Sequence, residues 1–142
     1  MSTRGTSMVM RTVVSLAGLW LLIGACGGSS RPLSPTVATT FVLSPGQIGS
    51  TSGASVKFVR VVSDSRCPLN AQCVQAGDVV VTVTLIGPSQ AATFDLQLAD
   101  SAKRTGALGG LVVELQAVTP YPIAGQPTNP ADYRATIELR PG

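Results

Sequence analysis

The side chains that could perform catalysis in this chain are its carboxylates, because none of the 142 residues is a histidine. Without imidazole no Ser–His or Cys–His arrangement can form, and the commonest general base and zinc ligand is missing. Paired carboxylates can serve a glycosidase, but that chemistry uses a deep cleft, for which one small domain has little room. The sequence therefore predicts a protein that is not an enzyme, with no catalytic residues, no cofactor and no metal. The carboxylates are Asp64, Asp78, Asp95, Asp100, Glu114, Asp132 and Glu138.

The first 25 residues have the pattern of an export signal. Arg4 and Arg11 precede an uncharged run from residue 12 to residue 25 in which Val, Leu, Ile and Trp are frequent. This run is shorter than the stretch of about 20 apolar residues that a membrane-spanning helix needs. We therefore expect residues 1–25 to be a signal peptide that is removed on export.

The signal ends in the segment Ile23-Gly24-Ala25-Cys26. This segment resembles the bacterial lipobox, in which small residues precede a cysteine whose thiol accepts a diacylglyceryl group. The resemblance implies that Cys26 becomes the lipidated N-terminus of a membrane-anchored lipoprotein, since two or three acyl chains hold a protein almost permanently. Gly27 is not the Asp that retains lipoproteins at the inner membrane of Gram-negative bacteria, so the outer membrane is expected in such a host. The alternative is an ordinary secretory signal with a coincidental cysteine.

Lipidation of Cys26 would leave Cys67 and Cys73 outside the cytoplasm, where disulfides persist. We expect these two cysteines to pair and to rigidify the loop of residues 67–73. The chain-entropy estimate for so short a loop is a stabilisation of about 2 kcal/mol.

The loop has four possible roles. Redox chemistry is disfavoured, because five residues separate the cysteines and the context is β rather than helical. A calcium site could use Asp64 and Asp78, although their spacing matches no EF-hand or related repeat. The loop could be a structural staple with Asp64 and Arg66 solvated. It could also be a recognition loop that presents Asp64, Arg66, Leu69 and Asn70 to a partner or a protease.

The segment Asp64-Ser65-Arg66-Cys67-Pro68, with Cys73-Val74-Gln75-Ala76-Gly77 after it, resembles a signature of uncharacterised secreted bacterial lipoproteins. Gln75 departs from the pattern, because those proteins usually carry a tryptophan there. The resemblance supports export but implies no activity.

Alternation of apolar and polar residues with a period of two predicts that the rest of the chain is built from strands. The apolar positions 79, 81, 83 and 85 share one face of a strand whose other face is also largely apolar, so this strand is expected to be central, with a hairpin partner after it. The expected strands are 41–43, 56–62 with a bulge, 79–86, 92–99, 111–116 and 133–140. Six or seven strands without helical periodicity predict an all-β sandwich over residues 41–142. Residues 26–40 are expected to be a flexible tether, because they contain few apolar side chains.

Residues 129–133, Asn-Pro-Ala-Asp-Tyr, resemble the tyrosine corner of immunoglobulin domains. This resemblance favours an immunoglobulin-like sandwich. The chain departs from that family because no further strand follows Leu139.

Removal of Arg4 and Arg11 with the signal would leave eight basic and seven acidic residues. A net charge this small, with no basic cluster, argues against nucleic acid as a partner. The sequence predicts a lipid-anchored, non-catalytic module that binds a protein or envelope component or has a structural role in the envelope. The alternative is a protease inhibitor that presents the Cys67–Cys73 loop.

Overall fold

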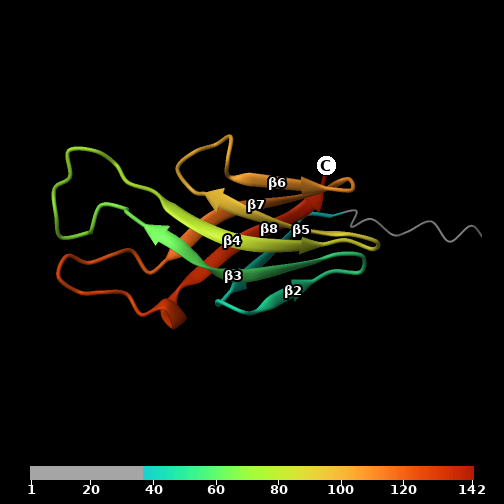
Figure 1. Ribbon diagram of the computed structural model, residues 1–142, viewed down its shortest axis with the longest axis horizontal. Coiled ribbons are helices and arrows are strands. Elements are labelled where there is room, and N and C mark those ends of the chain that lie inside the picture. The colour runs from blue at the N-terminus through green and yellow to red at the C-terminus, as the bar shows by residue number, and fades with distance from the viewer. Residues whose placement is uncertain (1–36) are drawn as a thin grey trace, which may run out of the picture. The chain divides into compact units, whose positions relative to one another are not determined.

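The computed structural model describes residues 37–142, which form an all-β domain (Figure 1). The expected signal peptide of residues 1–25, the lipidation site Cys26 and the expected tether as far as residue 36 lie outside the described residues. Within residues 37–142 no helix has the length and apolar character needed to cross a bilayer. The elements of this part of the chain are β1 (Thr39–Leu43), β2 (Ile48–Ser50), β3 (Ser55–Asp64), β4 (Val79–Ile86), β5 (Ala91–Gln97), β6 (Thr105–Leu108), β7 (Leu111–Thr119), the 3-10 helix η1 (Pro130–Asp132) and β8 (Arg134–Pro141).

The strands form two antiparallel sheets of four strands each, in the orders β1-β8-β7-β6 and β2-β3-β4-β5. The second sheet is a meander of consecutive strands. The chain then returns to the first sheet through β6, β7 and β8, and β8 pairs with β1. Apart from the β1–β8 pair, the neighbours in both sheets are therefore consecutive strands, and most of the connections between them are short.

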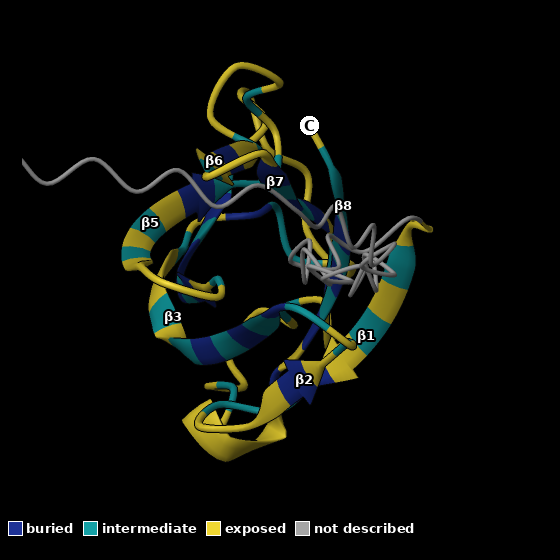
Figure 2. Ribbon diagram, turned by 90° about the vertical axis from the view of Figure 1, so that its right-hand side faces the viewer, coloured by how far each residue is buried: buried dark blue, intermediate teal, exposed yellow. Residues whose placement is uncertain are grey.

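The inner faces of the two sheets form the core. Apolar side chains alternate along β4 and β7, and the members of each set that point inward are fully or almost fully buried. Figure 2 shows buried segments on several strands, whereas exposed residues predominate in the connections. The largest core side chains come from both sheets, which is why the sheets stay together: Phe58, Leu85, Leu96, Leu115, Ile137 and Leu139.

Each side of the sandwich is closed by a phenylalanine that packs on a glycine. A Cβ on Gly49 of β2 would lie 2.5 Å from the ring of Phe41 of β1, and a Cβ on Gly106 of β6 would lie 2.6 Å from the ring of Phe94 of β5. Only glycine permits these close approaches. The two glycines thus let one sheet meet the other at both edges.

The prediction of an all-β sandwich is confirmed, with three differences. The domain has eight strands rather than six or seven, and β1 begins at Thr39, two residues before the expected boundary. Apart from the β1–β8 pair, neighbouring strands in both sheets are consecutive in sequence, so the connectivity is not the Greek key of immunoglobulin domains. The resemblance at residues 129–133 was therefore a poor guide to topology, because a tyrosine that opens a strand does not specify which strands pair.

Register shifts in two strands, β3 and β7, explain where the sequence pattern was hard to follow. The expected bulge in β3 is present, with register shifts at Phe58/Arg60 and at Val61/Ser63. A further shift at Leu115/Ala117 in β7 interrupts the alternation, so Val118 is buried although it breaks the period of two. As a result β7 extends to Thr119, three residues beyond its expected end.

Candidate functional site

Two long connections lie at the same end of the domain, which we call the loop end (Figure 1). One connection, residues 65–78, joins β3 to β4, and the other, residues 120–133, joins β7 to β8. The strand register requires this placement, because Asp64 pairs with Val79 and Thr119 pairs with Arg134. The two connections meet, and their contacts make up the candidate site.

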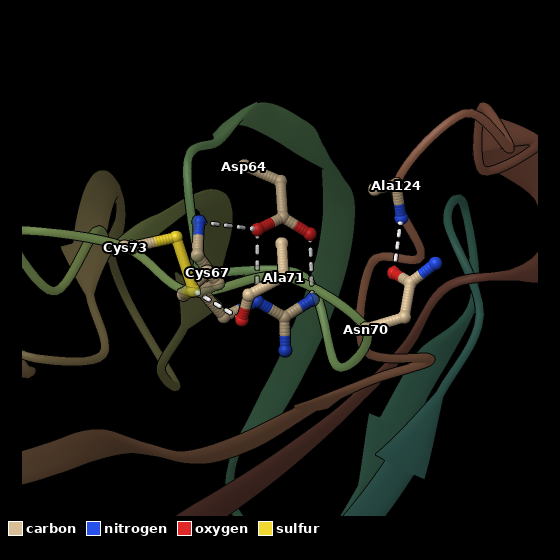
Figure 3. The surroundings of a disulfide bond; sticks show 7 residues. Asp64, Cys67, Asn70, Ala71, Cys73 and Ala124 are labelled. Atoms are coloured by element: carbon tan, nitrogen blue, oxygen red, sulfur yellow. Dashed lines mark hydrogen bonds and ion pairs between the residues drawn. A yellow bond between two sulfur atoms is a disulfide. The ribbon is translucent and has the colours of Figure 1, made fainter.

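The first connection contains the expected disulfide. Cys67 and Cys73 are bonded, with their Cα atoms 5.9 Å apart (Figure 3). Within this ring, the amide of Ala71 donates a hydrogen bond to the carbonyl of Pro68 at 3.1 Å, which forms a turn. The prediction of a covalently closed loop is confirmed.

The disulfide loop is hydrogen bonded to the second connection. The amide of Leu69 donates to the carbonyl of Pro122 at 3.0 Å. The amide of Ala124 donates to Oδ1 of Asn70 at 2.7 Å (Figure 3). These two bonds join segments more than fifty residues apart in sequence and hold the connections as one unit.

Beneath the loops, Arg66 is buried, with a side chain only 4% exposed. Its Nε donates to Oδ1 of Asp64 at 2.8 Å and its Nη2 donates to Oδ2 at 2.6 Å, a two-bond fork between planar groups. The amide of Arg66 also donates to Oδ1 of Asp64, at 3.2 Å. The charge of each side chain is therefore compensated where water is excluded.

The remaining donors of Arg66 reach the other sheet. Nη1 donates to the carbonyl of Val118 at 2.5 Å, and Nη2 donates to the carbonyl of Pro120 at 2.8 Å. The guanidinium carbon lies 4.5 Å from the centroid of the Tyr121 ring, within the range of a cation–π contact. Arg66 thus connects the end of β3 with the end of β7.

Tyr133 completes this buried group by donating its hydroxyl hydrogen to Oδ2 of Asp64 at 3.2 Å. Burial alone would raise the pKa of Asp64, but the hydrogen bonds and charge of Arg66 and the hydroxyl of Tyr133 outweigh burial and lower it. Burial, together with the Asp64 carboxylate, raises the pKa of Tyr133. Asp64 is therefore held as a carboxylate and Tyr133 as a neutral donor.

The structure corrects the expectation that Asp64 and Arg66 are presented to solvent, whether as recognition residues or as solvated parts of a staple. Both side chains are buried against each other. The physical reason is that the carbonyls at the end of β7 supply acceptors for Arg66, so the pair is satisfied without water. Of the other two expected recognition residues, Leu69 is 72% exposed, and the Asn70 side chain bonds within the domain.

The first connection also depends on a close approach between the backbones of Gly77 and Ser65. Ser65 and Asp78 face each other, with the Ser65 amide donating to the Asp78 carbonyl at 2.8 Å and the Asp78 amide donating to the Ser65 hydroxyl at 3.0 Å. A Cβ on Gly77 would lie 1.6 Å from the carbonyl oxygen of Ser65. A glycine is therefore required for the loop to close at its base.

The outer surface of the loop end is partly apolar. Four of its large hydrophobic residues are exposed: Leu69, Val74, Tyr121 and Ile123. A pocket of about 170 Å³ lies in the second connection and is lined in part by Tyr121, Gln126, Asn129 and Asp132. Sequence reasoning did not identify this pocket, because residues 120–132 have no strand pattern and no recognised motif.

The carboxylates considered for catalysis do not converge. Asp95 accepts a hydrogen bond from Thr82 at 2.6 Å on the outer face of β4 and β5, and Glu114 pairs with Arg140 at 3.7 Å on the first sheet. Oδ1 of Asp78 accepts from the amides of Val79 and Ala99. Among residues 37–142, no three acidic or cysteine side chains gather as a metal site would require.

Comparison of the chain with protein-family models, with curated proteins and with solved structures finds no match.

Proposed function

We propose that this protein is a lipid-anchored, non-catalytic module outside the cytoplasm, and that its loop end binds a partner in the cell envelope. The lipobox-like segment ending at Cys26 supports the anchor. The disulfide between Cys67 and Cys73 is compatible with an oxidising compartment. No nucleic acid is expected among its partners, because the exported chain is almost neutral.

The observation that carries the proposal is that β1, the first strand of residues 37–142, begins at the end of the domain opposite to the loop end. Thr39 pairs with Leu139, whereas Leu43 pairs with Ala135, next to the second connection. The chain therefore enters β1 from the end of the domain that lies away from the loops. Attachment to a membrane through residues N-terminal to β1 would therefore not require the residues of the loop end, which could meet a partner.

The construction of the loop end also supports a binding role. Its two connections are held by a disulfide, by cross-connection hydrogen bonds and by the buried Arg66. A surface fixed in this way loses little conformational entropy when it binds. Exposed apolar side chains such as Leu69 and Ile123 would then gain burial.

The alternative, a protease inhibitor, is less well supported. Proteases bind substrates and substrate-like inhibitors in an extended form, whereas residues 68–71 form a turn. The Leu69 amide is also already bonded to Pro122 and is not free to pair with a protease strand. A recognition surface made of both connections agrees better with this geometry.

The anchor is tested by the intact mass of the protein purified from its native membrane, with and without reduction. We expect the mass of residues 26–142 plus acyl chains, and a gain of two hydrogens on reduction. A full-length or unlipidated mass would overturn the anchored part of the proposal.

The binding role is tested by photo-crosslinking in the producing cells. A photoreactive residue replaces Leu69 in one variant and Ile48, which is also exposed but lies on β2, in the other. We expect a discrete crosslinked product from position 69 and none from position 48. Equal products, or none at position 69, would contradict the proposal.

A further inference from the structure

The pocket in the second connection has the composition of a site for a neutral, hydroxyl-rich ring. We propose that it binds one sugar ring of an envelope glycan. The aromatic ring of Tyr121 would pack against one face of the sugar, and Gln126, Asn129 and Asp132 would form hydrogen bonds with the sugar hydroxyls. This inference rests on the proposed function, in which the loop end binds an envelope partner. It specifies the chemical class of that partner.

Tyr121 supplies the apolar contact. Its ring is approached by the Arg66 guanidinium, with 4.5 Å between the guanidinium carbon and the ring centroid, yet the residue remains 47% exposed and lines the pocket. Arg66 is itself held by Asp64, so the Tyr121 ring packs on a guanidinium that is fixed in place. The C–H face of a sugar packs on such a ring. Pro120 and Pro127 also line the pocket and add apolar surface.

The polar side chains match hydroxyl groups. Amides offer donors and acceptors together, and a carboxylate accepts from two hydroxyls at once. Asn129 uses Oδ1 to accept from the amide of Ala131 at 3.0 Å, which leaves its Nδ2 donors for a ligand. Asp132 forms no ion pair among residues 37–142. Its carboxylate is therefore available at the pocket.

The same lining argues against other ligand classes. It contains no Lys or Arg, so a phosphate or an acidic sugar would meet only the negative Asp132. Most of its residues are exposed and several are polar, which does not suit a lipid chain. A volume of about 170 Å³ accommodates one ring rather than an extended chain.

The pocket is preorganised by its own main chain. The Gln126 amide donates to the Ile123 carbonyl at 3.0 Å, and the Asp132 amide donates to the Asn129 carbonyl at 2.9 Å. Arg134 donates from Nη1 to the carbonyls of Ala131 and Tyr133. These bonds hold the lining residues in place without a ligand, so little ordering is needed on binding.

The test uses the protein purified from its native membrane, in detergent micelles. Methyl glycosides of neutral hexoses and N-acetylhexosamines are screened by saturation-transfer NMR, and any that bind are titrated. We expect at least one glycoside to bind, with a Kd in the millimolar range that is typical of a ligand with few atoms. Absence of binding by every glycoside would overturn the inference.

Variants then locate the site. Tyr121→Ala and Asp132→Ala should each weaken binding at least tenfold, whereas Tyr121→Phe should keep it, because the ring and not the hydroxyl makes the contact. Ile48→Ala, an exposed apolar residue on β2, is the matched control and should bind like the wild type. Thermal melting checks that each variant is folded. Glycoside binding that survives both alanine variants would contradict the assignment to this pocket.

Different results would overturn the anchored binding module and the sugar site. A crosslink from position 69 to a protein, formed equally well by Asp132→Ala and without glycoside binding, would retain the binding module and overturn the sugar site. Glycoside binding at the pocket combined with an unlipidated mass would support the sugar site and overturn the anchor.

Discussion

Arg66 and Asp64 form a two-bond fork with donor–acceptor distances of 2.8 and 2.6 Å, although their side chains are only 4% and 7% exposed. Asp64 is the last residue of β3 and Arg66 lies two residues beyond it, in the first connection. The Arg66 guanidinium also donates to the carbonyls of Val118 and Pro120 at the end of β7. One buried guanidinium therefore links the two sheets beneath the loop end. An uncompensated charge in such a place is costly, because burial removes the water that would otherwise solvate it.

Replacement of Arg66 should therefore destabilise the domain strongly. We expect Arg66→Met to lower the free energy of unfolding by about 3–5 kcal/mol, because the change leaves Asp64 buried without its partner. Arg60→Met, at an exposed position on β3, should change the free energy of unfolding by less than about 0.5 kcal/mol. Urea unfolding of both variants measures the difference. Equal losses would show that the fork contributes nothing particular to stability.

Acid should weaken the domain through Asp64. The pKa of this carboxyl is lowered in the folded state by Arg66 and by hydrogen bonds that outweigh its burial. Its stabilising contribution is therefore complete above the unfolded-state pKa of about 3.9 and is lost as the pH falls through the lower folded-state pKa. Between neutral pH and about pH 2, the melting temperature of the wild type should fall further than that of Asp64→Asn. If the melting temperatures of the wild type and of Asp64→Asn fell by the same amount with pH, Asp64 would not be the source of the acid sensitivity.

The fold was largely predictable where β-branched residues alternate without interruption. Residues 79–86 were predicted as a central strand and form β4 with the same bounds. The short strands β2 and β6 were missed, because each contains a glycine that gives no apolar signal and that is buried under a phenylalanine from another strand. Local periodicity cannot report such a contact.

The candidate site was predictable only in its covalent part. The pairing of Cys67 with Cys73 followed from the expected export and is present. The burial of Arg66 was not predictable, because two of its acceptors lie 52 and 54 residues away in sequence. In sequence, a charged residue outside the strand pattern is expected to be solvated, because charged side chains are rarely buried unless they are paired.

A methyl group at Gly77 should disrupt the base of the first connection. A Cβ there would lie 1.6 Å from the carbonyl oxygen of Ser65, so the backbone must move and the paired bonds between Ser65 and Asp78 must lengthen. We expect Gly77→Ala to cost about 1–3 kcal/mol of unfolding free energy. At Gly87 the nearest atom would be 3.5 Å away, an ordinary contact, so Gly87→Ala is the matched control. A similar effect of both changes on chemical denaturation would count against the close approach.

Removal of the disulfide should loosen the loop more than it unfolds the domain. The double change Cys67→Ser and Cys73→Ser should cost about 2 kcal/mol by the chain-entropy estimate for a short ring. The amide of Leu69, which donates to Pro122, should then exchange its hydrogen faster.

The amides that flank the Arg66 fork should keep their protection in the same variant, because its partners at Asp64, Val118 and Pro120 do not involve the ring. Hydrogen exchange followed by NMR distinguishes the two regions. If the amide of Arg66 lost protection together with that of Leu69, the disulfide would be holding the buried fork as well as the turn. The two connections would then depend on the covalent bond for their whole arrangement, and reduction alone would dismantle the proposed binding surface.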